Sequence, residues 1–131
     1  MKLYLAGQYK QKEELAAVAG QLRAAGLEVT SRWLEEPHAP NITLDEIDVQ
    51  QLEKYAYADL TDIDACDILV AFATDPSIPT VRGGRHVEFG YALGRCKPIV
   101  VVGPYENIFH YLFYCVAHVK NVAELIAFLK S

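Results

Sequence analysis

The stretch ILVAF at residues 68–72 decides the fold, because five consecutive apolar residues are typical of a central parallel strand that is covered on both faces. Four further runs have the length and the apolar character of strands. They lie at Lys2–Ala6, Leu27–Thr30, Pro98–Val102 and Val116–Val119. We therefore expect five strands, spread along the whole chain.

Segments with helical periodicity separate these strands. We expect helices at Lys10–Ala25, Thr43–Ala65, His86–Arg95 and Val122–Lys130, and a helical turn at Ile108–Phe113. Alternating strands and helices predict a five-stranded parallel sheet with helices on both faces. The expected fold is an α/β three-layer sandwich of the flavodoxin-like or Rossmann-like kind, with residues 1–131 as a single domain.

The ends of the predicted helices carry their own signals. Leu15, Val18, Ala19 and Leu22 share one face of the first helix, and Gly26 is expected to end it. Thr43 with Glu46 has the spacing of a capping box, which predicts the start of the second helix. In such sheets ligands bind at the carboxyl ends of the strands. We therefore expect the site in the loops that begin at Gly7, Ala73 and Gly103.

Composition limits the class of partner. The chain has 12 basic and 17 acidic residues and a formal net charge of −5. It therefore lacks the positive field that attracts polyanions, and we expect no nucleic-acid polymer as a partner. No apolar run approaches the ~20 residues of a membrane span, and the N-terminal run is too short for a signal peptide. We expect no membrane contact and a cytoplasmic location.

The three cysteines form no CxxC pair, and no His pair has the spacing of metal ligands. The sequence therefore predicts neither a metal site nor a disulfide framework. Cys66 and Cys96 lie among apolar residues, and we expect both in the core.

Asp59 is the first candidate for chemistry. It lies on or beside the apolar stripe of the helix at 43–65, where an ionised carboxylate is costly. Either the carboxylate pairs with another group, or its pKa rises and it stays partly protonated. The alternative is a helix-edge aspartate that reaches water or caps a backbone group.

Glu88 is the second candidate. It lies in the first turns of the helix at 86–95, where a helix N-terminus favours an ionised carboxylate. Gly90 and Ala92 leave room for a ligand or for another helix. The alternative is a glutamate that only complements the helix dipole. Taken together, one ionised and one neutral carboxyl group would suit a nucleophile and an acid in a retaining displacement at a sugar carbon.

Two loops are candidate binding segments. Gly83 and Gly84 lie between a strand and a helix, where backbone amides bind phosphate, and Arg82 and Arg85 flank them. A solvated charged loop is the alternative reading. His86 follows this loop, where a structural role is the alternative to a catalytic one.

The other loop is Gly7-Gln8-Tyr9, after the first strand. Its amides could face a ligand, and Tyr9 could stack on a base; a simple turn is the alternative. Trp33 has the same two readings, and core packing is the expected one.

Three blocks of sequence resemble the nucleoside 2-deoxyribosyltransferase superfamily, which includes a deoxynucleoside 5′-monophosphate N-glycosidase branch. They are LYLAGQY at 3–9, ADLTDIDACDILVAF at 58–72 and GGRHVEFGYALGRCKPIVVV at 83–102. The resemblance implies cleavage or transfer at an N-glycosidic bond of a small nucleoside or nucleotide. It also implies a homodimer or higher homo-oligomer whose sites share residues, and it implies no cofactor.

The resemblance also implies roles for single residues. Glu88, in the E-x-G of the third block, would attack the anomeric carbon of the sugar. Asp59 would assist the nucleophile or the base, and Gln8 and Tyr9 would line the base pocket. Asn107 would reach the sugar of a neighbouring subunit's site.

One position departs from the family pattern. Transferase members often have an aspartate six residues before the nucleophile, and Arg82 stands there. A basic loop fits a 5′-phosphate, so we expect a nucleotide rather than a nucleoside. Two other functions stay open. One is a nucleotide-sensing module without turnover, and the other is a phosphoribohydrolase of the cytokinin-activating type, although the PGG-x-GT of that type is absent.

Overall fold

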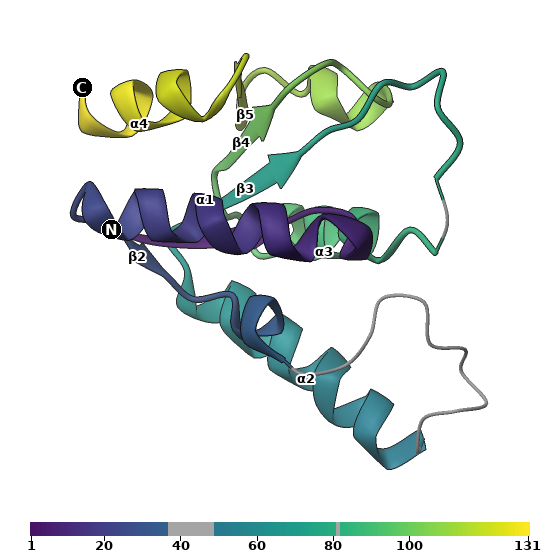
Figure 1. Ribbon diagram of the computed structural model, residues 1–131. Helices are drawn as coiled ribbons and strands as arrows, with labels where there is room; N and C mark the ends of the chain where they lie inside the picture. The colour runs from purple at the N-terminus through teal and green to yellow at the C-terminus, as the bar shows by residue number, and fades with distance from the viewer. Residues whose placement is uncertain (37–48, 81) are drawn as a thin grey trace.

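Five parallel strands form one sheet in the order β2-β1-β3-β4-β5 (Figure 1). We describe residues 1–36, 49–80 and 82–131 of a computed structural model of the chain. The strands are β1 (Lys2–Ala6), β2 (Glu28–Val29), β3 (Ile68–Phe72), β4 (Ile99–Val102) and β5 (Val116–Val119). The apolar run at 68–72 is the middle strand, and the predicted five-stranded α/β three-layer fold is confirmed.

Among the described residues, four α-helices cover the sheet: α1 (Lys12–Ala24), α2 (Val49–Ala65), α3 (Gly84–Gly94) and α4 (Val122–Lys130). Right-handed crossovers place the helix after β1 on one face, and the helices that precede and follow β3 on the other. Figure 1 shows α1 and α3 on opposite sides of the strands, and α2 packs on α3. The chain runs from β1 to β2 in one direction and from β3 to β4 in the other. The switch point of the topology therefore lies between β1 and β3.

The core consists of the strands and the inward faces of the helices. Leu3, Leu5, Leu69, Val70 and Val101 are fully buried. The predicted buried face of α1 is confirmed, and Gly26, at φ +87°, follows its end. Trp33 is buried, as expected, and its Nε1–H donates to the carbonyl of Leu5 at 2.9 Å.

Several boundaries differ from the prediction. A short 3-10 turn at Tyr9–Gln11 precedes α1, which therefore begins at Lys12. Gly83 takes a left-handed conformation (φ +71°) and lets α3 begin at Gly84, earlier than predicted. The turn after β4 is a 3-10 helix at Ile108–Tyr111. The predicted helix start at Thr43 and Glu46 lies outside the described residues.

The cysteines divide into two environments. Cys66 is buried, as expected, but the prediction for Cys96 was wrong because its side chain is exposed. Cys96 follows the end of α3 with a φ of +57°, in the left-handed position that closes a helix and faces solvent. Within the described ranges, no helix is both long and apolar enough to cross a membrane.

Candidate active site

A cavity of about 260 Å³ opens at the switch point. Its walls come from the loop after β1, from α2 and from the start of α3, together with the segment after β2. The lining residues are Gly7, Gln8, Tyr9, Lys10, Trp33, Glu36, Tyr55, Asp59, Arg82, Gly83, Gly84, Arg85 and Glu88. The fold therefore brings Asp59 and Glu88 to one cavity, together with both predicted loops.

Glu88 lies in the second turn of α3, and Tyr4 of β1 donates its hydroxyl hydrogen to Glu88 Oε2. Burial raises the pKa of Glu88 to about 8; the Tyr4 hydrogen bond works against this rise, and the charge of Asp59 adds to it. From the sequence, we expect the helix N-terminus to keep Glu88 ionised. The pKa of Glu88 is raised instead, because burial outweighs the helix dipole.

Asp59 faces the same cavity from α2. Burial raises its pKa to about 7, with smaller contributions from the negative charges of Glu36 and Asp62. In the part of the chain that the structure describes, its Oδ1 is buried and has no hydrogen-bond partner. A buried acceptor without a donor is costly, so a ligand with a hydrogen-bond donor, or a proton on Asp59 itself, would stabilise this position.

Tyr4 is the site residue that the sequence reasoning missed. Its side chain is fully buried in β1, and burial, with the charge of Glu88, raises the pKa of its hydroxyl group. It is therefore a neutral donor at any working pH. The available signal was a single hydroxyl-bearing residue in an apolar strand, because a buried tyrosine hydroxyl needs a partner.

Aromatic side chains form one wall of the cavity. The rings of Tyr9 and Trp33 lie 6.0 Å apart at 35°, and Tyr55 of α2 lines the same space. Lys12 Nζ lies 5.6 Å from the Tyr9 ring centroid. Burial raises the pKa of Tyr9 to about 12, so its hydroxyl stays protonated. Flat apolar faces beside two carboxyl groups suit a planar ring that carries polar edges.

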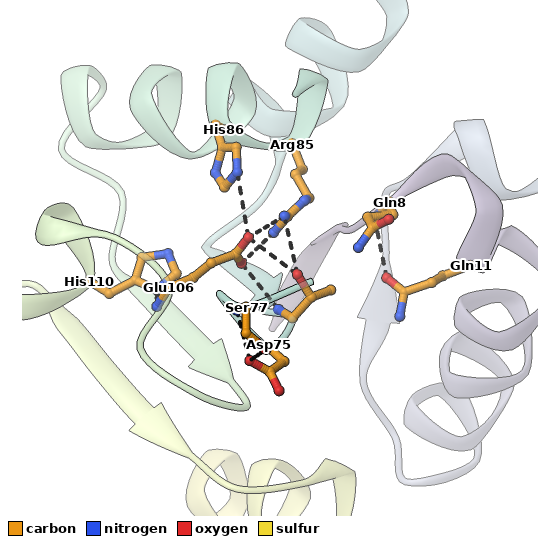
Figure 2. A network of polar contacts seen from close by, with 9 residues as sticks. Gln8, Gln11, Asp75, Ser77, Arg85, His86, Glu106 and His110 are labelled. Carbon is orange, nitrogen blue, oxygen red and sulfur yellow. Dashed lines mark hydrogen bonds and ion pairs between the residues drawn. The ribbon is translucent and has the colours of Figure 1, made fainter. Parts of the chain in front are cut away.

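Arg85 borders the cavity, but its guanidinium is bound elsewhere (Figure 2). Arg85 Nη1 donates to Glu106 Oε1 at 2.6 Å, and Nη2 donates to Glu106 Oε2. Arg82, the other arginine of the predicted phosphate loop, is exposed. Its backbone has a φ of +73°, so Arg82 and Gly83 are both in the left-handed region. Gly83 and Gly84 line the cavity at the N-terminus of α3, the end of a helix that attracts anions.

The structure does not bring His86 and Asn107 to the Glu88 cavity. They line a second, apolar space with Phe89, Gly90 and Phe109 on another side of α3. Asn107 accepts a hydrogen bond from the backbone of Phe109 at 2.9 Å and so caps the 3-10 turn. Across residues 1–36, 49–80 and 82–131, no three His, Cys, Asp or Glu side chains are grouped as metal ligands.

Comparisons with known proteins identify the family and the fold. Residues 3–123 match the family described as nucleoside 2-deoxyribosyltransferase. No curated protein gives a significant match.

Three solved structures share the fold over nearly the whole chain. A CMP N-glycosidase of Clostridium botulinum is 22% identical, with a TM-score of 0.61 over 99% of this chain and 98% of its own. A conserved protein of Enterococcus faecalis is 22% identical, with a TM-score of 0.67 over 99% and 97%. A 2-deoxyribosyltransferase of Bacillus psychrosaccharolyticus is 20% identical, with a TM-score of 0.66 over 96% and 90%.

Proposed function

Since the chain belongs to the nucleoside 2-deoxyribosyltransferase family, we propose that it cleaves or transfers the N-glycosidic bond of a nucleoside or a nucleoside 5′-monophosphate. One observation carries the proposal: Glu88, held by the Tyr4 hydroxyl, faces Asp59 across a cavity with an aromatic wall. Two carboxyl groups at one small cavity are what a displacement at an anomeric carbon requires.

Glu88 is the nucleophile in this account. Its ionised carboxylate attacks C1′ of the sugar, a C1′–O bond forms, and the C1′–N bond breaks with its electron pair going to the base. The Tyr4 hydroxyl holds the carboxylate in place. A water oxygen or the nitrogen of a second base then attacks C1′, gives up its proton to the Asp59 carboxylate, and releases Glu88 as the C1′–O bond to it breaks. Water gives a hydrolase, and a second base gives a transferase.

The departing base needs a proton, and Asp59 is the acid that the site offers. A pKa of about 7 leaves a fraction of Asp59 protonated near neutral pH. Because the pKa of Glu88 is about 8, the reactive state, with Glu88 ionised and Asp59 protonated, is the minor arrangement of the proton that the two groups share. The Asp59 carboxylate that remains after proton transfer to the base then accepts hydrogen bonds from the bound sugar or base. Water is the other source of the proton, and Asp59 then orients Glu88 or holds the sugar.

The charges around the cavity support a 5′-phosphate on the substrate. Lys10 and Arg82 are cations at its border, and Gly83 and Gly84 supply the N-terminus of α3. Arg85 is not needed for this role, since Glu106 already binds it. A monophosphate should therefore be a better substrate than its nucleoside.

We also propose that the protein is a homodimer or a larger homo-oligomer, with the His86 side of α3 and the adjacent Asn107 of the loop after β4 at the interface. Ile108 and Phe109, which follow Asn107 directly, are large apolar side chains that are exposed. Light scattering after size-exclusion chromatography tests this, because a monomer at micromolar concentration would contradict it.

The experiment is a panel of nucleosides and their 5′-monophosphates, with free base measured by chromatography. We expect base release by the wild type, a higher kcat/KM for the monophosphates, and no release by Glu88→Ala. Glu14→Gln, on the exposed face of α1, is the matched control and should match the wild type.

The same panel separates the other functions. Tight binding of a nucleotide without any base release would support a sensor. Release from ribonucleotides that persists in Glu88→Ala would support a different hydrolase and would refute the proposal.

A further inference from the structure

A buried ion pair lies beside the cavity and has no part in the proposed chemistry. The side chains of Arg85 and Glu106 are only 7% and 9% exposed, and two guanidinium nitrogens meet two carboxylate oxygens. The backbone N–H of Thr74 donates to Glu106 Oε1 at 3.1 Å, and its hydroxyl donates to Oε2 at 3.3 Å. One carboxylate thus joins the end of β3, the start of α3 and the loop after β4 (Figure 2).

The charge on Glu106 is permanent in the working range of pH. Burial alone would raise its pKa, but the hydrogen bonds from Arg85 and Thr74 outweigh burial and lower it to about 2. His86 Nε2 lies 3.8 Å from the same carboxylate. The pair is therefore a fixed bidentate clamp rather than a titrating group.

The loop that carries Glu106 holds α3 at a second point. The backbone N–H of Glu106 donates to His110 Nδ1 at 3.1 Å, and the ring of buried His110 lies 5.2 Å from the ring of Phe89. Phe89 directly follows Glu88, and Arg85 lies three residues, about one helical turn, before Glu88. Arg85 and Phe89 are thus both contacted from the loop after β4.

A buried ion pair is weak evidence for stability, because desolvation offsets much of the attraction between the charges. Its bidentate geometry does fix orientation, and here it fixes the first turn of α3, which leads directly into the turn that carries Glu88. We propose that Glu106 is a positioning residue: through Arg85 it sets the place of the first turn of α3 and so aims Glu88 at the cavity. This inference rests on the proposed role of Glu88 as nucleophile.

The test compares Glu106→Gln and Glu106→Asp with a control elsewhere on the same side of the sheet. Glu106→Gln keeps the shape and loses the charge that grips Arg85. We expect kcat to fall about 10- to 100-fold, as expected for a misplaced nucleophile, and KM to change by less than about threefold, because substrate contacts remain. Glu106→Asp keeps the charge on a shorter side chain and should recover part of kcat.

Lys97→Met is the matched control. Lys97 Nζ donates to the carbonyls of Asp64 and Cys66 and ties the far end of α3 to α2. Its loss should lower the Tm while kcat stays at the wild-type value. A Glu106→Gln protein with a lowered Tm and a wild-type kcat would overturn the proposal, since Glu106 would then be only structural.

A second readout does not need turnover. The pKa of Glu88 can be measured from the pH dependence of the 13C NMR signal of its carboxyl carbon. Tyr4 of β1 and Asp59 of α2 are the titratable groups that interact with Glu88, and both are kept in every variant. A loosened turn admits water to Glu88, so Glu106→Gln should lower the pKa of Glu88, and Lys97→Met should leave it unchanged. An unchanged pKa in Glu106→Gln would contradict the positioning role even if the wild type releases no base.

If Glu106→Gln does not fold, Thr74→Val removes a single hydrogen bond from the same carboxylate. We expect a smaller loss of kcat with the same sign. A wild-type kcat in both Thr74→Val and Glu106→Asp would then overturn the proposal.

Discussion

Tyr4→Phe tests how the fold prepares its nucleophile. The change removes one hydroxyl group and leaves the packing of a fully buried ring in β1. A hydrogen bond to a charged group contributes about 1.5–3 kcal/mol, and one pKa unit corresponds to about 1.4 kcal/mol. Because the bond stabilises the ionised form, its loss should raise the pKa of Glu88 from about 8 by roughly one to two units.

The assay is the dependence of kcat/KM on pH for the best substrate of the panel. The limb that rises with Glu88 ionisation should move to higher pH, and kcat/KM at pH 7 should fall roughly 10- to 100-fold. Tyr91→Phe is the matched control, because the hydroxyl of Tyr91 contacts Asp64 at the surface. A rising limb that stays in place would refute the argument that Tyr4 favours the ionised carboxylate.

Three further changes give distinct signatures. Asp59→Asn removes a negative charge that raises the pKa of Glu88, so the rising limb of kcat/KM should move to lower pH. If Asp59 protonates the base, the fall of kcat/KM at high pH should also disappear. A shift of the rising limb to higher pH would contradict this prediction. Glu88→Gln stays neutral at every pH, whereas the wild type, whose pKa is raised from 4.5 to about 8 on folding, loses stability as the pH rises through that window. Urea unfolding should therefore find Glu88→Gln more stable than the wild type at pH 8.5 by up to roughly 4 kcal/mol, and about equally stable near pH 4. If the variant and the wild type are equally stable at both pH values, this would count against burial of Glu88. Gly103→Ala adds a methyl group 3.1 Å from the carbonyl oxygen of Ala73 at a φ of +113°, which should cost about 1–3 kcal/mol in thermal unfolding, whereas Gly20→Ala, with open space in α1, should not destabilise.

The sheet could be predicted from the sequence because its strands are short apolar runs between helical segments. The cavity was predictable for a related reason, since the carboxyl ends of neighbouring parallel strands meet at one edge. Gly7 directly follows β1, Asp59 and Glu88 lie on the helices before and after β3, and all three line the cavity.

The charges of the site were harder to predict. A helix N-terminus stabilises a carboxylate by only about 0.3–1 kcal/mol, and the sequence gives no measure of the burial that outweighs it at Glu88. The pairing of Arg85 with Glu106 depends on the neighbouring positions of β3 and β4, which bring together residues 21 positions apart.

The position of His86 follows from helical geometry. Two residues span about 200° around a helix, so His86 and Glu88 face different sides of α3. That argument was available from the sequence, and it explains why His86 lines the second cavity with Asn107.

The central claim is a covalent bond between Glu88 and the sugar. A substrate with fluorine at C2′ slows the release of the glycosyl group, and trypsin frees residues 86–95 as a peptide, HVEFGYALGR, in which Glu88 is the single side-chain carboxylate. Mass spectrometry after rapid quenching should find this peptide heavier by one glycosyl group, and Glu88→Gln should give no adduct. Base release without any adduct on this peptide, or an adduct on another peptide, would contradict the account.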